Sequence, residues 1–226
     1  PLIPELMQDN PWAGFTVDFT WKCHHSMVID NICDFAHAFL HRKYQPFVDA
    51  KLTHHEADSN RVFLTYDTYM AEGKFSRYFV DRKRVNTRSI EIGYDYPYQW
   101  SNTGNSIKHY CFLLPIDERT TRVFFVFYFD SVKIPLLPFS VPKWLTQTVL
   151  NASVPLLFKP LLEEDGVALE AEQIGYDEHW DAPPIELNPV VPMLQKLAVQ
   201  KWQGYVDRMT PAPKEKSDST RVQETA

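Results

Sequence analysis

The stretch that organises this chain is Asp30-Asn31-Ile32-Cys33-Asp34-Phe35-Ala36-His37-Ala38-Phe39-Leu40-His41. Helical side chains advance about 100° per residue, so a helix over these residues carries Asp34, His37 and His41 on one face. Two histidines with this spacing can bind one metal ion from a single helix. A carboxylate beside them can hold a ring N–H and fix the tautomer of the imidazole, which is the role we predict for Asp34. We interpret the stretch as a helix with Ser26 as its N-cap and a candidate metal site on one face.

The alternative interpretation of this stretch is a solvated polar helix face. The neighbouring residues argue against it, because they make the helix apolar almost all round: Ile29, Ile32, Phe35, Ala36, Phe39 and Leu40. Buried imidazoles and carboxylates need partners, and a metal ion is one such partner. The pattern therefore favours a buried metal site over a solvated face.

Composition limits the class of protein. The chain has 226 residues, enough for one sizeable domain with a core. A formal net charge of -6 argues against nucleic acid as the main partner. No window offers the roughly 18 apolar residues of a membrane span, so no transmembrane segment is expected. The 3 cysteines, an odd and sparse set, fit a reducing cytoplasm better than a disulfide framework.

Alternating runs of apolar and aromatic residues predict successive strands joined as an antiparallel meander. The predicted strands are 15–21, 48–55, 61–70, 84–94, 106–114 and 121–129. Proline positions and amphipathic patterns predict helices at 142–150, 160–173 and 190–205. These elements indicate the α+β class. Residues 13–208 are the expected domain, residues 1–12 a linker and residues 209–226 a disordered tail.

The helix predicted at 160–173 directs one acidic residue towards the core. Asp165 shares a helix face with Leu161, Leu162, Ala168 and Leu169. Glu163 lies on the opposite side and Glu164 roughly perpendicular. A lone Asp on a buried face is costly unless it is paired. The alternative is a carboxylate near the helix start that the helix dipole stabilises.

The most apolar predicted strand is 123–129, with the sequence Val-Phe-Phe-Val-Phe-Tyr-Phe. One interpretation is a central strand buried on both faces, and another is that one face lines a ligand pocket. The two interpretations are compatible. The candidate pocket residues are Trp100, Phe127, Tyr128 and Phe129.

At these residues the sequence resembles the catalytic, C-terminal domain of Rieske non-haem iron oxygenase alpha subunits. The family pattern is Asn-x2-Asp-x2-His-x3or4-His, and four residues fit it with the shorter histidine spacing: Asn31, Asp34, His37 and His41. The family's third ligand is a carboxylate near the end of the chain, in a run that here reads Glu163-Glu164-Asp165-Gly166-Val167-Ala168-Leu169-Glu170-Ala171-Glu172-Gln173. By that match Asp165 is the third ligand. The resemblance points to the branch that holds the pheophorbide, vanillate and steroid-ring monooxygenases.

The resemblance implies a helix-grip (START-like) fold, with an antiparallel sheet around a long C-terminal helix. It also implies an Fe(II) ion held by His37, His41 and Asp165. This site activates O₂ to hydroxylate or oxidatively demethylate an apolar or aromatic substrate, as a mono- or dioxygenase. Asn31 and Asp34 are implied catalytic residues, and Asp34 is expected to pass electrons from a Rieske cluster in a neighbouring subunit.

Further partners follow from the resemblance. Electrons are expected from NAD(P)H through a reductase or ferredoxin to a [2Fe-2S] Rieske cluster, in a homotrimer of full-length subunits. A Rieske centre needs two Cys and two His, and only half of that motif is present, in Cys23-His24-His25. We therefore expect the cluster on a domain outside this sequence, with residues 1–12 as the linker that follows it.

Two other functions stay open. Helix-grip domains also bind apolar small molecules without chemistry, in which case the His and Asp residues are polar anchors. A structural zinc site is the third possibility, although structural zinc usually takes four protein ligands and favours Cys.

Overall fold

The structure is a computed structural model that describes residues 3, 6, 11–41, 47–70, 87–130, 142–182 and 185–210. Most of the predicted linker and most of the predicted tail lie outside these residues. In the described part of the chain, no helix is long and apolar enough to cross a membrane.

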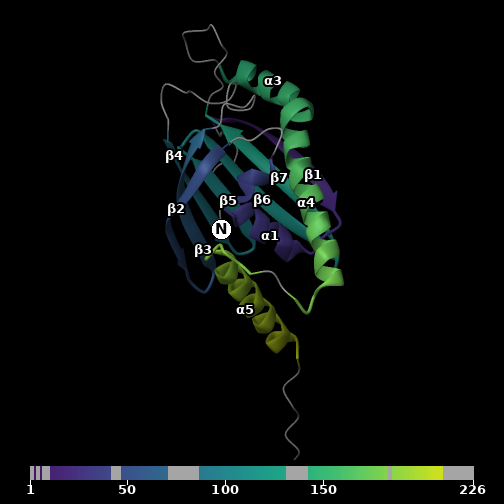
Figure 1. Cartoon of the computed structure of the whole chain (residues 1–226). Helices are drawn as coiled ribbons and strands as arrows, with labels where there is room; N and C mark the ends of the chain where they lie inside the picture. The colour runs from purple at the N-terminus through teal and green to yellow at the C-terminus, as the bar shows by residue number, and fades with distance from the viewer. Residues whose placement is uncertain are drawn as a thin grey trace, which may run out of the picture.

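One antiparallel sheet of seven strands forms the centre of the molecule (Figure 1). The strands are β1 (Ala13–Trp21), β2 (Phe47–Ala57), β3 (Arg61–Met70), β4 (Thr87–Asp95), β5 (Tyr98–Thr103), β6 (Ile107–Asp117) and β7 (Thr120–Phe129). Their order across the sheet is β1-β7-β6-β5-β4-β3-β2. Strands β2 to β7 thus form a meander, as the sequence predicts, and β1 joins it beside β7.

The helices gather on one face of this sheet. They are α1 (His25–Cys33), the 3₁₀ helix η2 (His37–Leu40), α3 (Lys143–Ser153), the π-helical turn η3 (Val154–Phe158), α4 (Lys159–Glu178) and α5 (Val191–Met209). Figure 1 shows α1 and α4 in front of the sheet and α5 at one end. This arrangement confirms the predicted α+β class and the helix-grip fold.

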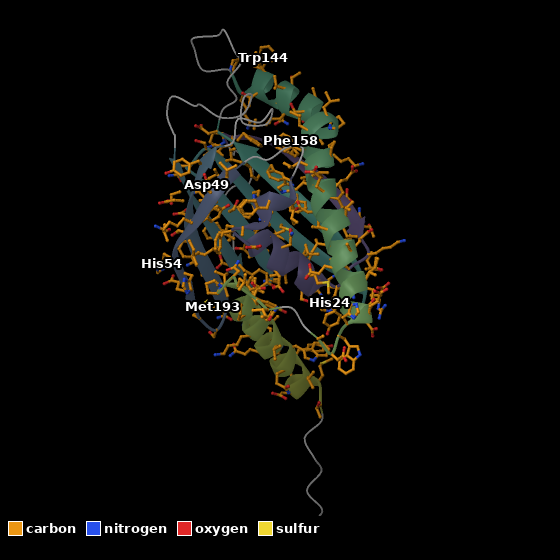
Figure 2. All side chains as sticks on the ribbon, viewed as in Figure 1. His24, Asp49, His54, Trp144, Phe158 and Met193 are labelled. Atoms are coloured by element: carbon orange, nitrogen blue, oxygen red, sulfur yellow. The ribbon has the colours of Figure 1, made fainter. Side chains whose placement is uncertain are left out.

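The core lies between the sheet and these helices. On β7 the side chains alternate, so that four residues face the core: Val123, Phe125, Phe127 and Phe129. Phe158, from η3, is 1% exposed and packs its ring 4.6 Å from that of Phe15 on β1. Side chains fill the space between helices and sheet, whereas Trp144 lies exposed at the outer end of α3 (Figure 2).

A glycine lets α4 approach β1 closely. A Cβ atom on Gly166 would overlap the indole of Trp21, which is itself 4% exposed. Leu161, Leu162, Asp165 and Leu169 are buried on the same helix, and Glu163 is exposed. The buried face predicted for this helix is therefore confirmed.

The prediction of one helix over residues 30–41 is wrong. Helix α1 ends at Cys33, and Asp34 is extended, with φ -75° and ψ 113°. The Asp34 carboxylate accepts a hydrogen bond from the backbone N–H of Ala36 at 2.9 Å. Such local bonds compete with helical hydrogen bonds, which explains the break. At the other end the N-cap is His24, not Ser26, because its ring nitrogen accepts from the Ser26 N–H.

Sequence analysis also missed strand β5. Its residues Tyr98-Gln-Trp-Ser-Asn-Thr103 are mostly polar, and their inward side chains are buried by neighbouring strands rather than by an apolar pattern of their own. The helix predicted at 190–205 corresponds to α5, on which Val191, Leu194 and Leu197 are buried. Its later turns are more exposed, since Trp202 is 65% exposed.

Candidate metal centre

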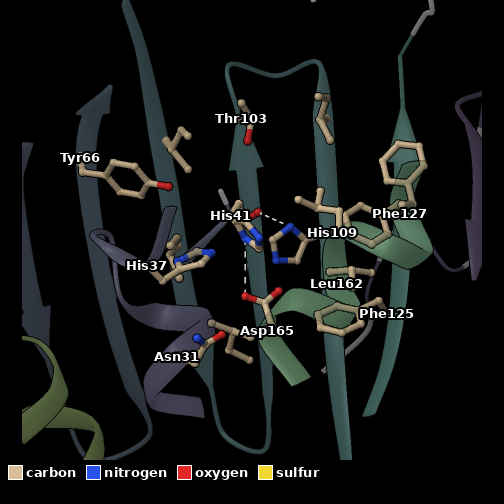
Figure 3. Close-up of a pocket in the computed structure, with 17 residues that line it drawn as sticks. Asn31, His37, His41, Tyr66, Thr103, His109, Phe125, Phe127, Leu162 and Asp165 are labelled. Carbon is tan, nitrogen blue, oxygen red and sulfur yellow. Dashed lines mark hydrogen bonds and ion pairs between the residues drawn. The ribbon is translucent and has the colours of Figure 1, made fainter. Parts of the chain in front are cut away.

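The two histidines reach the core through an irregular segment. His37 begins η2, and His41 directly follows η2, with only 4% of its surface exposed. The rings of His37 and His41 lie 5.5 Å apart and nearly perpendicular, at 80°. The break after Cys33 therefore does not separate them. It turns both rings towards one point between helix and sheet (Figure 3).

Asp34 fixes the tautomer of His37, but through its backbone. Nδ1 of His37 lies 2.5 Å from the main-chain oxygen of Asp34, so it donates its proton to that carbonyl. The Nε2 lone pair is then available for a metal ion. The predicted orientation of His37 by the Asp34 carboxylate is thus corrected, because that carboxylate accepts instead from Ala36 and from Nδ2 of Asn188, at 2.8 Å.

Asp165 completes a group of three possible ligands. One ligand atom each from His37, His41 and Asp165 lies within 4.8 Å of the others. Asp165 is 4% exposed, and burial raises the pKa of its carboxyl while the two histidines act in the opposite direction. Burial also lowers the pKa of His41, against the attraction of Asp165. A neutral imidazole is the form that binds a metal.

A fourth side chain stands behind His41. Oε2 of Glu164 lies 3.4 Å from Nδ1 of His41, while Nε2 of His41 lies 3.5 Å from Oδ1 of Asp165. Three buried atoms have no hydrogen-bond partner among the residues that the structure describes: His41 Nδ1, Glu164 Oε2 and Asp165 Oδ1. Buried polar atoms are normally paired. A cation between His41 and Asp165 would satisfy the carboxylate, so the donor set fits a metal ion.

The three residues form one wall of a cavity of about 140 Å³. Its other walls are mainly apolar and include Ile90, Ile92, Phe125, Phe127, Leu161 and Leu162. Polar side chains on the sheet side are Tyr66, Ser101, Thr103 and His109. Burial, with a smaller contribution from His37, lowers the pKa of His109 to about 4, so its ring is neutral at pH 7.

Sequence analysis did not identify these sheet-side residues, nor the position of Glu164 behind His41. Buried and half-buried residues alternate along β5, so that Ser101 and Thr103 point to the same face. This pattern can be recognised only once the pairing of β5 with its neighbours is known. His109 pairs with Ser101 across β5 and β6.

Asn31 lies where the family pattern implies a site residue. It lines the cavity from α1, and its buried Oδ1 makes no hydrogen bond within the described residues. Figure 3 shows it beside Asp165, on the helical side of the cavity. Asp34 itself does not line the cavity.

The four aromatic residues predicted to line the pocket lie on two different faces of the sheet. Phe127 lines the cavity. Phe129 is on the same face and packs against Phe15 and Phe158, but it does not itself line the cavity. Trp100 and Tyr128 lie on the opposite face, where the Trp100 indole N–H donates to Asp95 at 2.6 Å. The expectation that Trp100 and Tyr128 face this cavity is corrected by the alternation of side chains along β5 and β7.

Comparison with solved structures supports the same class of fold. The crystal structure of dicamba monooxygenase aligns with 91% of this chain, over 65% of its own chain, with a TM-score of 0.64 and 14% identity. A quaternary ammonium Rieske monooxygenase aligns with 87% of this chain and 50% of its own, with a TM-score of 0.54 and 15% identity. At such low identity these likenesses concern the fold. The fold and the three convergent ligand side chains define the class: a helix-grip domain with a candidate metal centre.

The sequence identifies the family. The model of the vanillate O-demethylase oxygenase C-terminal domain matches residues 21–205, and the chain belongs to that family. It is 41% identical over 219 residues to a 4beta-methylsterol monooxygenase of Methylococcus capsulatus. The match covers 96% of this chain and 59% of that relative, so the chain spans little more than half of the relative's length.

Proposed function

We propose that this chain is the catalytic domain of a Rieske-type monooxygenase, which binds Fe(II) through His37, His41 and Asp165 and oxidises an apolar substrate in the cavity beside them. The observation that carries the proposal is the convergence of these three ligand atoms within 4.8 Å in the wall of an apolar cavity. Family membership supports the oxygenase class.

Fe(II) held by two imidazoles and one carboxylate supplies O₂ activation, because coordination positions stay open. The residues of the chain supply the rest. The Asp34 carbonyl holds the Nδ1–H of His37, so that Nε2 faces the site. Glu164 lies where it orients Nδ1–H of His41. Ile90, Ile92 and Phe127 exclude water and position an apolar substrate.

For the substrate we propose a methyl or ring carbon of an apolar ring compound. The relative from Methylococcus capsulatus is named for a methylsterol, which supports this chemical type. A cavity of about 140 Å³ is close in size to one that holds a single benzene ring. One ring with the reacting carbon therefore fits beside the metal ligands, and the remainder of a larger molecule extends through the mouth of the cavity.

For the source of electrons we propose a [2Fe-2S] Rieske cluster on a domain outside this sequence, supplied from NAD(P)H by a reductase or ferredoxin. The length of the relative, of which this chain spans 59%, supports such a domain. We further propose a cytoplasmic homotrimer in which Asp34 lies on the route from a neighbouring subunit's cluster. Asn31 and Asp34 would then act beside the metal without binding it.

The test is iron content. The full 226-residue chain is reconstituted anaerobically with Fe(II), desalted and assayed for iron per chain, alongside His37→Ala, Asp165→Ala and Glu163→Ala. We expect about one iron per chain in wild type and in the exposed Glu163 variant, and loss of iron in the other two. A folded wild type that retains no iron would refute the iron site and favour the non-catalytic binding domain.

A further inference from the structure

Strand β5 brings a polar stripe into an otherwise apolar core. Its three inward residues, Gln99, Ser101 and Thr103, are all polar and at most 7% exposed. Their neighbours on the same rows of the sheet are mainly apolar, such as Ile90, which pairs with Thr103. Polar side chains in a core destabilise the fold unless they are paired, so this stripe requires an explanation.

Two of these groups pair with each other through His109. Nε2 of His109 lies 3.1 Å from Oε1 of Gln99, and Nδ1 lies 2.8 Å from Oγ of Ser101. Because Gln99 Oε1 only accepts, Nε2 of the neutral ring carries the proton. Nδ1 then accepts from the Ser101 hydroxyl. The hydroxyl of Ser101 therefore donates its proton to His109. The hydroxyl oxygen of Ser101, which lines the cavity, can still accept a hydrogen bond from a ligand.

Tyr66 brings a second polar group to the same cavity from β3. Its side chain is 6% exposed, and its hydroxyl points into the cavity (Figure 3). Its contact is a ring contact with Phe35, and within the described part of the chain the hydroxyl makes no hydrogen bond. Burial raises the pKa of Tyr66, so this hydroxyl keeps its proton. The Tyr66 hydroxyl is therefore a donor that faces the cavity and has no acceptor among the described residues.

We propose that Tyr66 and Ser101 together bind the hydroxyl group of an otherwise apolar ring molecule. The ligand hydroxyl donates to the oxygen of Ser101 and accepts from the O–H of Tyr66. This inference rests on the proposed function, for which it names the substrate class: an apolar ring that bears one uncharged hydroxyl. His109 is a positioning residue, since it orients the Ser101 proton away from the ligand.

Charge on the walls agrees with a neutral ligand group. The polar groups on the sheet side are uncharged, since His109 is neutral and Tyr66 is protonated. The nearest charged group that faces the cavity is Asp165, among the metal ligands on the opposite wall. A carboxylate on the ligand would find no cation on the sheet side among the residues that line the cavity.

The test uses phenol and toluene, which have the same shape and differ in one hydroxyl. The affinities of phenol and toluene for the metal-free 226-residue chain are measured by ligand-observed NMR for wild type, Tyr66→Phe, Ser101→Ala and a control, Tyr69→Phe. Tyr69 lies on the same strand but is 50% exposed. Thermal unfolding shows that each variant is folded. We expect both cavity variants to weaken phenol binding roughly three- to tenfold, as for loss of one hydrogen bond, and to leave toluene binding within about twofold. Tyr69→Phe should change neither.

Equal changes for phenol and toluene, or a phenol-specific loss in only one cavity variant, would overturn the two-sided recognition. Iron content is measured separately on the same proteins. Selective phenol binding without iron would retain the hydroxyl site and refute the oxygenase. Bound iron without selectivity for phenol over toluene would support the iron site and refute the hydroxyl site.

Discussion

The helical wall and the sheet wall of the cavity differ in charge. The helical wall, formed by η2, the residue that follows it and α4, brings together two imidazoles and a carboxylate. Buried atoms of His41 and Asp165 have no hydrogen-bond partner within the described ranges. The sheet wall carries neutral groups, and its His109 is paired on both ring nitrogens. The two walls therefore differ in what they can bind: the donor set of the helical wall fits a cation, and the sheet wall suits an uncharged molecule.

The largest predicted effect tests the neutrality of the sheet wall. The pKa of His109 is lowered to about 4, whereas an unfolded histidine titrates near 6.5. The unfolded state therefore binds more protons between these values, and stability falls as the pH falls through this window. Between pH 7 and pH 4, wild type should lose up to about 3 kcal/mol more unfolding free energy than His109→Leu. Denaturant unfolding at both pH values measures this difference.

The control for this experiment is His54→Leu, because the side chain of His54 is 55% exposed. That variant should follow the pH dependence of wild type. If the curves of wild type and His109→Leu ran parallel, the pKa of His109 would be the same in the folded and unfolded states, and burial would not keep this ring neutral below pH 6.5.

The next effect concerns the packing that positions the helical wall. Gly166→Ala should lower the unfolding free energy by about 1–3 kcal/mol, because its methyl group overlaps the Trp21 side chain. Gly175→Ala on the same helix has open space and should stabilise by up to about 1 kcal/mol. Urea unfolding of both variants gives the comparison. An unchanged unfolding free energy in Gly166→Ala would show that the packing of α4 does not depend on this close approach.

A third prediction concerns the carboxylate behind His41. Glu164→Gln should weaken metal binding roughly tenfold or more, since carboxylates that hold a ligating imidazole raise its basicity. Titration with Co(II), followed by calorimetry, measures the affinity without turnover. Glu163→Gln, on the exposed side of α4, is the matched control. Equal affinities in the two variants would show that Glu164 does not orient His41.

The smallest predicted effect distinguishes the role of the Asp34 carboxylate from that of the Asp34 main-chain carbonyl. Asp34→Ala removes the acceptor for Ala36 and Asn188 and should cost about 1–2 kcal/mol of unfolding free energy. Asp34→Asn keeps an acceptor oxygen and should cost less. Co(II) affinity should persist in Asp34→Asn, because the carbonyl that holds His37 is unchanged. Loss of binding in that variant would show that His37 depends on the carboxylate charge.

The two walls also differ in how far the sequence predicted them. His37, His41 and Asp165 were identifiable because the histidine spacing and the apolar face of α4 are local patterns. The backbone that carries the histidines was not, since the carboxylate of Asp34 ends α1 by a local bond that competes with the helix. The polar groups of the sheet wall are brought together by the pairing of strands. Ser101 and Tyr66 could therefore be recognised as cavity residues only from the strand register.

The hydrogen bond between Asn188 and Asp34 joins parts of the chain 154 residues apart. Asn188 is 8% exposed, and its Oδ1 also accepts from the N–H of Val190, at the start of α5. During synthesis, the segment that carries His37 leaves the ribosome long before Asn188 does. The last support of that segment therefore arrives only when the domain is nearly complete, so the candidate metal centre gains this support only after Asn188 has been synthesised.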